Sequence, residues 1–378
     1  MTAPESFAPT TGGNSFTLRA HAEFGAKPGN LFFSGTSLRA ALGLAYQGAR
    51  GNTAVQMSRA LDLDPDATRA AASARREAAE LQSAAGAAEM FVANRLWPDT
   101  SILVKPTFTA SAERGYGATT GSVDFVHAAD ASRITINEWV ATETRGKIRD
   151  LLPEGSVDHL TRLVLTNAIY FKGAWEHVFP KAQTRDGAFM IDRDRTVTAQ
   201  LMNLTSDFAF GHVADVKIVE LRYDRSRLAM LVVLPDQLGG LAQVEQGLSA
   251  ERLGKWVAAL SRTRVNVTLP RFTFGWGGSV GAELQQLGVA EAFEESADFT
   301  GIAEPREGLY LDDVFHEAFV AVDEVGTEAA AATAAVMMAR SVPPRSTEFR
   351  ADHPFLFFVR DTASGQIHFA GRVVNPVG

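Results

Sequence analysis

Three residues in the C-terminal half of the chain could, by type and order, form the catalytic group of a serine hydrolase. Residues 277–281 read Gly-Gly-Ser-Val-Gly, which fits the G-x-S-x-G pattern around a nucleophilic serine, Ser279. Asp312 and His316 follow in the chain order that α/β-hydrolases use. However, no His-Gly-Gly segment that would supply an oxyanion hole precedes the serine. We therefore keep ester or amide hydrolysis through Ser279 only as a distant alternative.

The other residue types argue against thiol and metal chemistry. The chain has no cysteine, which excludes disulfides, thiolate nucleophiles and cysteine-based metal sites. Its 8 histidines are scattered, and none belongs to an H-E-x-x-H pair. We predict no metal and no cofactor, and a fold that is stabilised by packing.

Composition and charge limit the class of partner. Of the 378 residues, 46% are hydrophobic and 21% are charged, a balance typical of a globular protein with a packed core. The net charge of -8 is spread along the chain, without a Lys/Arg block long enough to follow a phosphate backbone. No stretch reaches the roughly 18 apolar residues of a membrane span. We expect a monomer with no nucleic-acid or membrane partner.

The elements that must position these side chains change in type along the chain. Apolar residues at helical spacing and strong helix formers predict helices in the first half, over residues 37–47, 54–61, 67–88, 104–110 and 131–144. Period-two and apolar runs predict strands over residues 89–97, 163–171, 216–222, 229–234, 264–269, 272–274, 315–323, 355–359 and 367–374. Two helices interrupt the strands, near residues 249–260 and 279–287. Helices first and strands later indicate an α+β fold.

The two ends of the chain frame one domain. Residues 1–13 are polar, rich in Thr, Pro and Gly, and lack the apolar core of a signal peptide. We expect this segment to be flexible and the protein to be cytoplasmic or a mature secreted form. The rest, residues 14–378, contains no fixed-period repeat and no interdomain linker. We predict a single domain.

Residues 326–344 do not fit the surrounding pattern. This Ala-rich segment lies between two predicted strands, and a connection of that length usually serves a function. By composition, residues 329–339 would form a short surface helix. At a period of two, Glu328 falls on one side of the segment and small or apolar side chains fall on the other. The small or apolar side holds Thr327, Ala329, Ala331, Thr333, Ala335 and Met337. The segment could therefore also become a half-buried strand.

At this point the sequence resembles a known family, the serpins, from residue 15 to residue 376. Residues 323–332, Asp-Glu-Val-Gly-Thr-Glu-Ala-Ala-Ala-Ala, resemble the hinge of inhibitory members, and residues 349–359, Phe-Arg-Ala-Asp-His-Pro-Phe-Leu-Phe-Phe-Val, resemble the family signature after the reactive loop. Further matches in order are residues 136–140, 146–148, 167–175 and 371–376. One departure is Gly35, where the family usually has proline.

The resemblance implies an α+β serpin fold, with helices packed on a large central mixed sheet, two smaller sheets and an exposed reactive-centre loop at about residues 324–345. It implies a suicide inhibitor that traps a protease when the cleaved loop inserts into the central sheet as a new strand; serpin loop insertion is a known example of strand addition. The implied hinge residues are Glu324, Gly326, Thr327, Glu328, Ala329, Ala330, Ala331 and Ala332.

The resemblance also implies a reactive bond. Arg340 is the seventeenth residue when Glu324 is counted as the first, which is the family's usual position before the scissile bond. Fully extended, that segment spans roughly 55 Å at about 3.3 Å per residue. Arginine suits the acidic specificity pocket of a trypsin-like protease, so we expect cleavage at Arg340-Ser341 and a covalent complex with such a protease. Rival bonds are Met338-Ala339 and Arg345-Ser346.

A second set of residues is implied to control opening of the sheet. Ser34, Ser37, Asn167 and His316 match positions that form a polar cluster beneath the central sheet in serpins, and Trp175 matches a tryptophan at its upper end, where insertion begins. We hypothesise that protonation of His316 tunes this opening near neutral pH. The alternative within the family is a non-inhibitory binding or chaperone-like member, against which the small-residue hinge argues.

Overall fold

The helices follow the order expected from the sequence. The computed structural model describes residues 12–118, 120–304, 308–327 and 346–378. Its α-helices are α1 (Gly12–Phe24), α2 (Gly35–Tyr46), α3 (Gly51–Ala60), α4 (Ala67–Ala85), α5 (Pro106–Tyr116), α6 (Phe125–Glu143), α7 (Leu241–Gln246), α8 (Ala250–Ala258) and α9 (Gly281–Leu284). Short turns of other helix types follow at Lys181–Gln183, Gln285–Val289 and Ala290–Phe293. Within these described ranges, no helix combines the length and apolarity needed to span a bilayer.

Polar caps fix where several helices begin. The Ser34, Asp66 and Asp124 side chains each accept a hydrogen bond from a backbone N–H in the first turn of α2, α4 and α6, groups that the helix itself leaves unpaired. At the start of α2, a Cβ on Gly35 would lie only 2.0 Å from Thr17 Oγ1 of α1. Glycine at this position therefore permits the close contact of α1 with α2.

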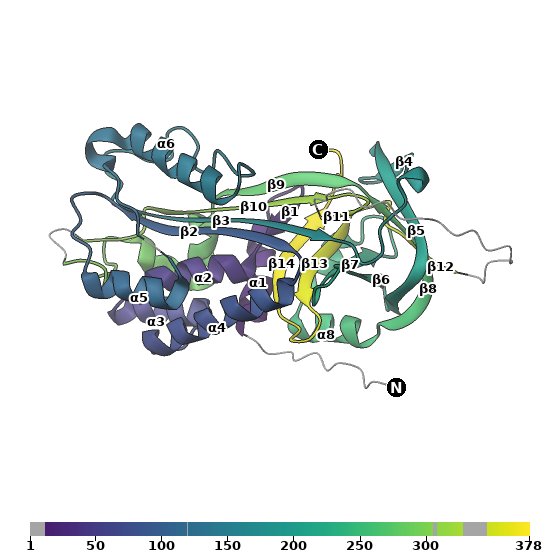
Figure 1. The fold of residues 1–378 in the computed structure, drawn as a ribbon, viewed down its shortest axis with the longest axis horizontal. Helices are drawn as coiled ribbons and strands as arrows, with labels where there is room; N and C mark the ends of the chain where they lie inside the picture. The colour runs from purple at the N-terminus through teal and green to yellow at the C-terminus, as the bar shows by residue number, and fades with distance from the viewer. Residues whose placement is uncertain (1–11, 119, 305–307, 328–345) are drawn as a thin grey trace.

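Within the described residues, the central sheet has five strands in the order β2-β3-β11-β10-β9. Their bounds are β2 (Glu89–Pro98), β3 (Leu163–Ala174), β9 (Phe272–Ser279), β10 (Asp313–Val322) and β11 (Gly326–Thr327). Figure 1 shows α6 on one face of this sheet and α2 to α5 on the other. The central sheet is therefore the middle layer between two layers of helices.

The other strands in the described part of the chain form a single nine-stranded sheet, where two smaller sheets were expected. Its path is β1 (Leu31–Phe33), β14 (Ile367–Val373), β13 (Phe355–Asp361), β7 (Leu228–Pro235), β6 (Val216–Arg222), β5 (Thr196–Val213), β8 (Ser261–Pro270) and β12 (Thr347–Arg350), with β4 (Arg185–Met190) also on β5. The long strand β5 pairs with β4 and β8 over most of its length and with β6 near its end. Its hydrogen bonds therefore join the two expected sheets.

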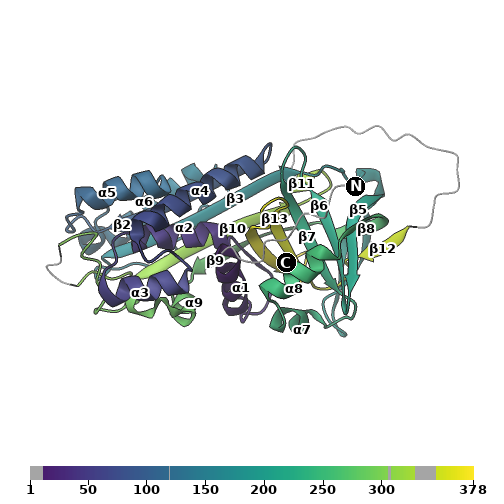
Figure 2. The same cartoon turned by 90° about the horizontal axis from the view of Figure 1, so that it is seen from below.

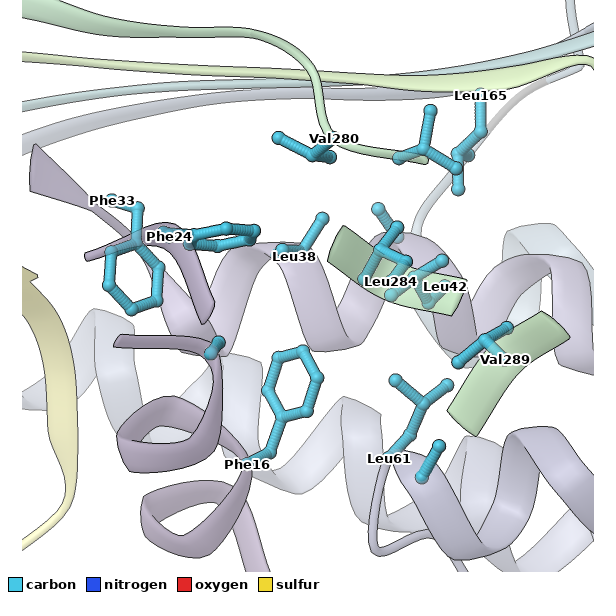
Figure 3. Packing of buried hydrophobic residues seen from close by; sticks show 14 of the residues in the cluster. Phe16, Phe24, Phe33, Leu38, Leu42, Leu61, Leu165, Val280, Leu284 and Val289 are labelled. Carbon is cyan, nitrogen blue, oxygen red and sulfur yellow. The ribbon is translucent and has the colours of Figure 1, made fainter. Parts of the chain in front are cut away.

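Three apolar clusters hold the layers together. One fills the space between the helices and the lower face of the central sheet, and Figure 3 shows part of it, with Phe16, Leu38 and Leu42 facing Leu165 and Val280. A second joins the central sheet to the nine-stranded sheet, which occupies the opposite half of the elongated molecule in Figure 2. The third lies under α6. The central sheet is thus covered on both faces, and the α+β expectation is confirmed.

Candidate functional site

The candidate site is the junction of β3 and β10, two neighbouring parallel strands. Residues 313–319 of β10 pair with residues 164–170 of β3. Beyond this paired stretch the two strands separate, and β11 lies between them, antiparallel to both. The sheet is therefore closed along one part of the junction and already holds an additional strand at the other.

The residues of β11 belong to the predicted hinge. Gly326 pairs with Ala174, and Thr327 pairs with both Gly173 and Val322. A Cβ at Gly326 would stand 2.0 Å from the carbonyl oxygen of Gly173, so a larger residue would push the strands apart. Glycine is thus required for the close approach of this hinge segment to β3.

Trp175 and Tyr223 pack together and form hydrogen bonds with the hinge segment. The Trp175 ring stacks on Tyr223 with centroids 4.8 Å apart, and its Nε1 donates to the Asp323 carbonyl at 3.0 Å. The Tyr223 and Thr327 hydroxyls share a hydrogen bond of 2.9 Å. Burial raises the pKa of Tyr223, so its hydroxyl keeps its proton. The structure brings Trp175 beside the hinge, whereas Tyr223 had no signal in the sequence.

Glu324 is a buried carboxylate at the base of the hinge, with 4% of its surface exposed. Thr184 Oγ1 donates a hydrogen bond of 2.7 Å to Oε1, and Arg271 Nε lies 3.7 Å from Oε2. The Glu324 carbonyl accepts from the Phe179 backbone N–H at 2.8 Å. These partners come from two distant parts of the chain, residues 179–184 and Arg271, so the sequence could not point to them.

The polar cluster lies on the closed part of the junction. Asn167 Nδ2 donates to Ser37 Oγ at 2.7 Å and also contacts Asn94 Oδ1, while Asn167 Oδ1 lies 2.5 Å from His316 Nδ1. Asn94 was not predicted. Ser34, in contrast, caps α2 and donates to the His368 carbonyl at 2.8 Å, outside this network. The structure therefore brings together Ser37, Asn167 and His316 and leaves Ser34 apart.

The proposed protonation of His316 near neutral pH is wrong. The ring is fully buried, and this desolvation lowers its pKa from 6.5 to about 3. Because Asn167 Oδ1 can only accept, His316 Nδ1 carries the ring proton, and Nε2 has no hydrogen-bond partner in the described part of the chain. His316 is therefore a neutral structural group at physiological pH.

The predicted hydrolase residues do not meet. Ser279 pairs in register with Phe315, so the next residue, His316, points to the opposite face of the sheet, toward Asn167. The Asp312 carboxylate accepts the backbone N–H groups of Arg162 and Leu163 at 2.8 and 2.9 Å instead of orienting an imidazole. Ser279, Asp312 and His316 are therefore not arranged as a catalytic triad.

The remaining predicted residues lie outside the described part of the chain. They are the outer hinge residues Glu328, Ala329, Ala330, Ala331 and Ala332 and the predicted reactive bond, Arg340 and Ser341.

Comparison with known proteins identifies the class. The family model for "Serpin (serine protease inhibitor)" matches residues 11–376. The chain is 40% identical over 358 residues to the leukocyte elastase inhibitor of Sus scrofa, covering 92% of this chain and 93% of the relative. The human protein of the same name is 38% identical over 359 residues, with the same coverage.

Solved structures agree with the sequence relatives. Serpin48 of the insect Tenebrio molitor, described as highly specific, superposes with a TM-score of 0.86 at 30% identity over 96% of this chain and 97% of its own. Uncleaved ovalbumin gives a TM-score of 0.88 at 27% identity over 98% of this chain and 100% of its own. The chain belongs to the serpin family of serine protease inhibitors, which confirms the predicted fold and class and removes the hydrolase alternative.

Proposed function

We propose that the protein is a suicide inhibitor of trypsin-like serine proteases, cleaved at Arg340-Ser341. The observation that carries the inhibitory part of this proposal is the pairing of β11, while the target class rests on the position of Arg340 in the sequence. Two hinge residues already form ladder hydrogen bonds between β3 and β10, ahead of the segment that leads to Arg340. A strand that has begun to insert needs only continuation of the same pairing, so insertion starts without a new nucleation step.

Continuing this pairing gives one consistent register. Thr327 opposes Gly173 on β3 and Val322 on β10, so six residues further Thr333 would oppose Asn167 and His316. Those two residues already face each other in the closed sheet. Because both neighbours lead to the same pair, the inserted strand would need no bulge. Ala329, Ala331 and Thr333 would share the buried face of Thr327, which small side chains permit.

The chemistry of trapping follows from ordinary acyl transfer. The serine oxygen of the protease attacks the Arg340 carbonyl carbon, the peptide bond to Ser341 breaks, and the Ser341 nitrogen leaves as a free amine after taking up a proton from the catalytic histidine of the protease. Arg340 then remains esterified to the protease. Insertion carries this ester along the sheet, and a misplacement of about 1 Å in the protease's catalytic groups would slow deacylation by about 10²-fold.

The name of the curated relatives favours a second target class. An elastase has a small, uncharged specificity pocket, which does not accept arginine. Such a protease would cleave at an apolar bond of the same segment, and Met338-Ala339 is the candidate. The two classes predict different scissile bonds and can be separated in one experiment.

The test is to incubate the protein with trypsin and with leukocyte elastase, resolve covalent complexes on a denaturing gel, and find the released C-terminal peptide by mass spectrometry. We expect a stable trypsin complex and a peptide that begins at Ser341. Arg340→Ala should reduce the rate of complex formation with trypsin by at least about 10²-fold. The matched control Arg345→Ala removes the same side chain five residues on and should leave that rate unchanged.

Three outcomes would contradict the proposal. Cleavage without any complex would indicate a substrate or a non-inhibitory serpin. A complex with elastase alone, released after Met338, would move the target class. Equal loss of trypsin complex in both arginine variants would mean that Arg340 is not the specificity residue.

A further inference from the structure

The strands that would separate on insertion carry one carboxylic acid without a partner, Glu317. It lies on β10 between Phe315 and Phe319, which both belong to the apolar cluster under α6. Glu317 is half-buried, and its Oε1 lies against β9, 3.1 Å from where a Cβ of Gly275 would stand. Among the described residues, no hydrogen bond or ion pair reaches this carboxyl group. An acid in this position costs stability whenever it is charged.

The segment that packs on the same face of the sheet as Glu317 connects α6 to β3. Its apolar side chains at Ile148, Leu151, Leu152 and Val157 belong to one cluster with Val164 and Ala168 of β3 and Phe315 of β10. The segment therefore packs across both strands of the junction. Separation of β3 and β10 would break apolar contacts within this cluster.

The charged and titratable groups near this face come from each neighbouring element. On β2, the Arg95 guanidinium lies over the Trp97 and Trp139 rings, and on β3, the Tyr170 ring lies under the Lys147 ammonium. The segment between α6 and β3 contributes Asp150, which is exposed and lines an open pocket together with Arg149 and with Arg133 and Glu138 of α6. On β9, the residues nearest in register are glycines. Of these groups, Asp150 is the one whose charge acts on the Glu317 carboxyl.

Burial, and after it the negative charge of Asp150, raise the pKa of Glu317 from 4.5 to about 7. The neutral acid is therefore favoured by the same packing that closes the segment over the sheet. Its ionisation adds a second negative charge on β10 that is repelled by Asp150 of the segment.

We propose that Glu317 and Asp150 form a proton-controlled latch: protonated Glu317 keeps residues 146–157 seated on β3 and β10, and its ionisation loosens the segment and eases strand separation. This effect on the sheet does not depend on the proposed function. The effect on protease trapping rests on the proposed function. If that function holds, ionisation of Glu317 makes trapping faster at alkaline than at acid pH.

The direction of the pH dependence follows from linkage. Because the folded protein holds this proton more tightly than the unfolded chain, the contribution of Glu317 to stability falls as the pH rises from 4.5 through 7 and is constant above. The ionised fraction grows from roughly 10% at pH 6 to roughly 90% at pH 8. The latch thus operates across neutral pH.

The test is hydrogen exchange at pH 6 and pH 8, with each amide rate divided by its intrinsic rate at that pH. We expect opening of residues 146–157 to be several-fold more frequent at pH 8 than at pH 6 in the wild type. Glu317→Gln, which mimics the protonated acid, should remove that difference and keep the low value. Asp150→Asn should reduce the difference and move its midpoint below 7. The control Glu154→Gln removes an exposed charge in the same segment and should behave as the wild type.

Equal protection of the wild type at both pH values, or a pH difference that survives in Glu317→Gln, would overturn the latch. Because no protease is used, this result is independent of the proposed inhibition. If the latch is confirmed, complex formation with trypsin can be compared between the wild type and Glu317→Gln at each pH, so that the pH dependence of trypsin itself cancels. The latch would have no role in trapping if, at pH 8, the wild type formed the trypsin complex no faster than Glu317→Gln.

Discussion

The two sheets of this protein differ in how their middle strands pair and in which side chains lie between them. In the nine-stranded sheet, β13 pairs antiparallel with β14 and β7, and every residue of the three strands is buried. Phe32 stacks on Phe357 and Phe369, with ring centroids 5.6 and 5.2 Å apart. In the central sheet, β3 and β10 pair in parallel, which is slightly weaker per residue, and polar groups occupy the middle of the junction.

This difference distinguishes a sheet that stays paired from one that would open under the proposed function. Apolar aromatic contacts are lost in full when strands part, whereas hydrogen bonds of a polar cluster can be remade with an incoming strand. The charged groups follow the same division. The Glu220–Arg360 pair of the nine-stranded sheet is buried and bonded, while Glu317 of the central sheet is partnerless within the described residues.

The largest effect is expected where the permanent sheet is broken. Arg360→Ala should lower the free energy of unfolding by about 3–5 kcal/mol, because the buried Glu220 carboxylate loses its main partner. Urea unfolding followed by tryptophan fluorescence measures this change. Arg222→Ala is the control, since Arg222 Nε lies 3.8 Å from Glu220 and its side chain is 51% exposed; there we expect a loss below about 1 kcal/mol. Similar losses in both variants would contradict the assignment.

A smaller effect concerns the buried histidine in each sheet. Burial lowers the pKa of His316 to about 3 and of His368 to about 4, so both contribute stability that is lost as the pH falls below 6.5. Between pH 6.5 and pH 4.5, His316→Gln should lose about 2 kcal/mol less than the wild type, and His368→Gln a similar amount. Urea midpoints across this range provide the measurement. An unchanged acid slope in either variant would mean that the histidine is charged in the folded protein.

The smallest effect is at the hinge. Tyr223→Phe removes the hydrogen bond to Thr327 and should cost about 1 kcal/mol. Hydrogen exchange should show lower protection at Gly326 and Thr327 and none of this change in β13. As a control, Tyr46→Phe removes a buried hydroxyl that bonds the Asp64 and Pro65 carbonyls far from the hinge. If both variants loosened β11 equally, the hinge would not depend on Tyr223 specifically.

Local patterns in the chain were sufficient for the fold class and for most of its elements. Apolar periodicity and helix formers located α2, α4 and the buried strand β3, because those signals depend only on neighbouring residues. The family motifs pointed to Asn167, His316 and Trp175 as residues of one region. They also marked the hinge, where Gly326 and Thr327 now lie in β11.

What these side chains do was decided by tertiary structure. A pKa depends on desolvation and on charges that folding brings near, so the sequence alone led to His316 as the group that titrates near neutral pH. In the folded protein that residue is neutral, whereas burial, and after it the negative charge of Asp150, raise the pKa of the next residue, Glu317, to about 7. Neighbours in sequence face opposite sides of a strand, and only the packing on each side distinguishes a structural histidine from a titrating acid.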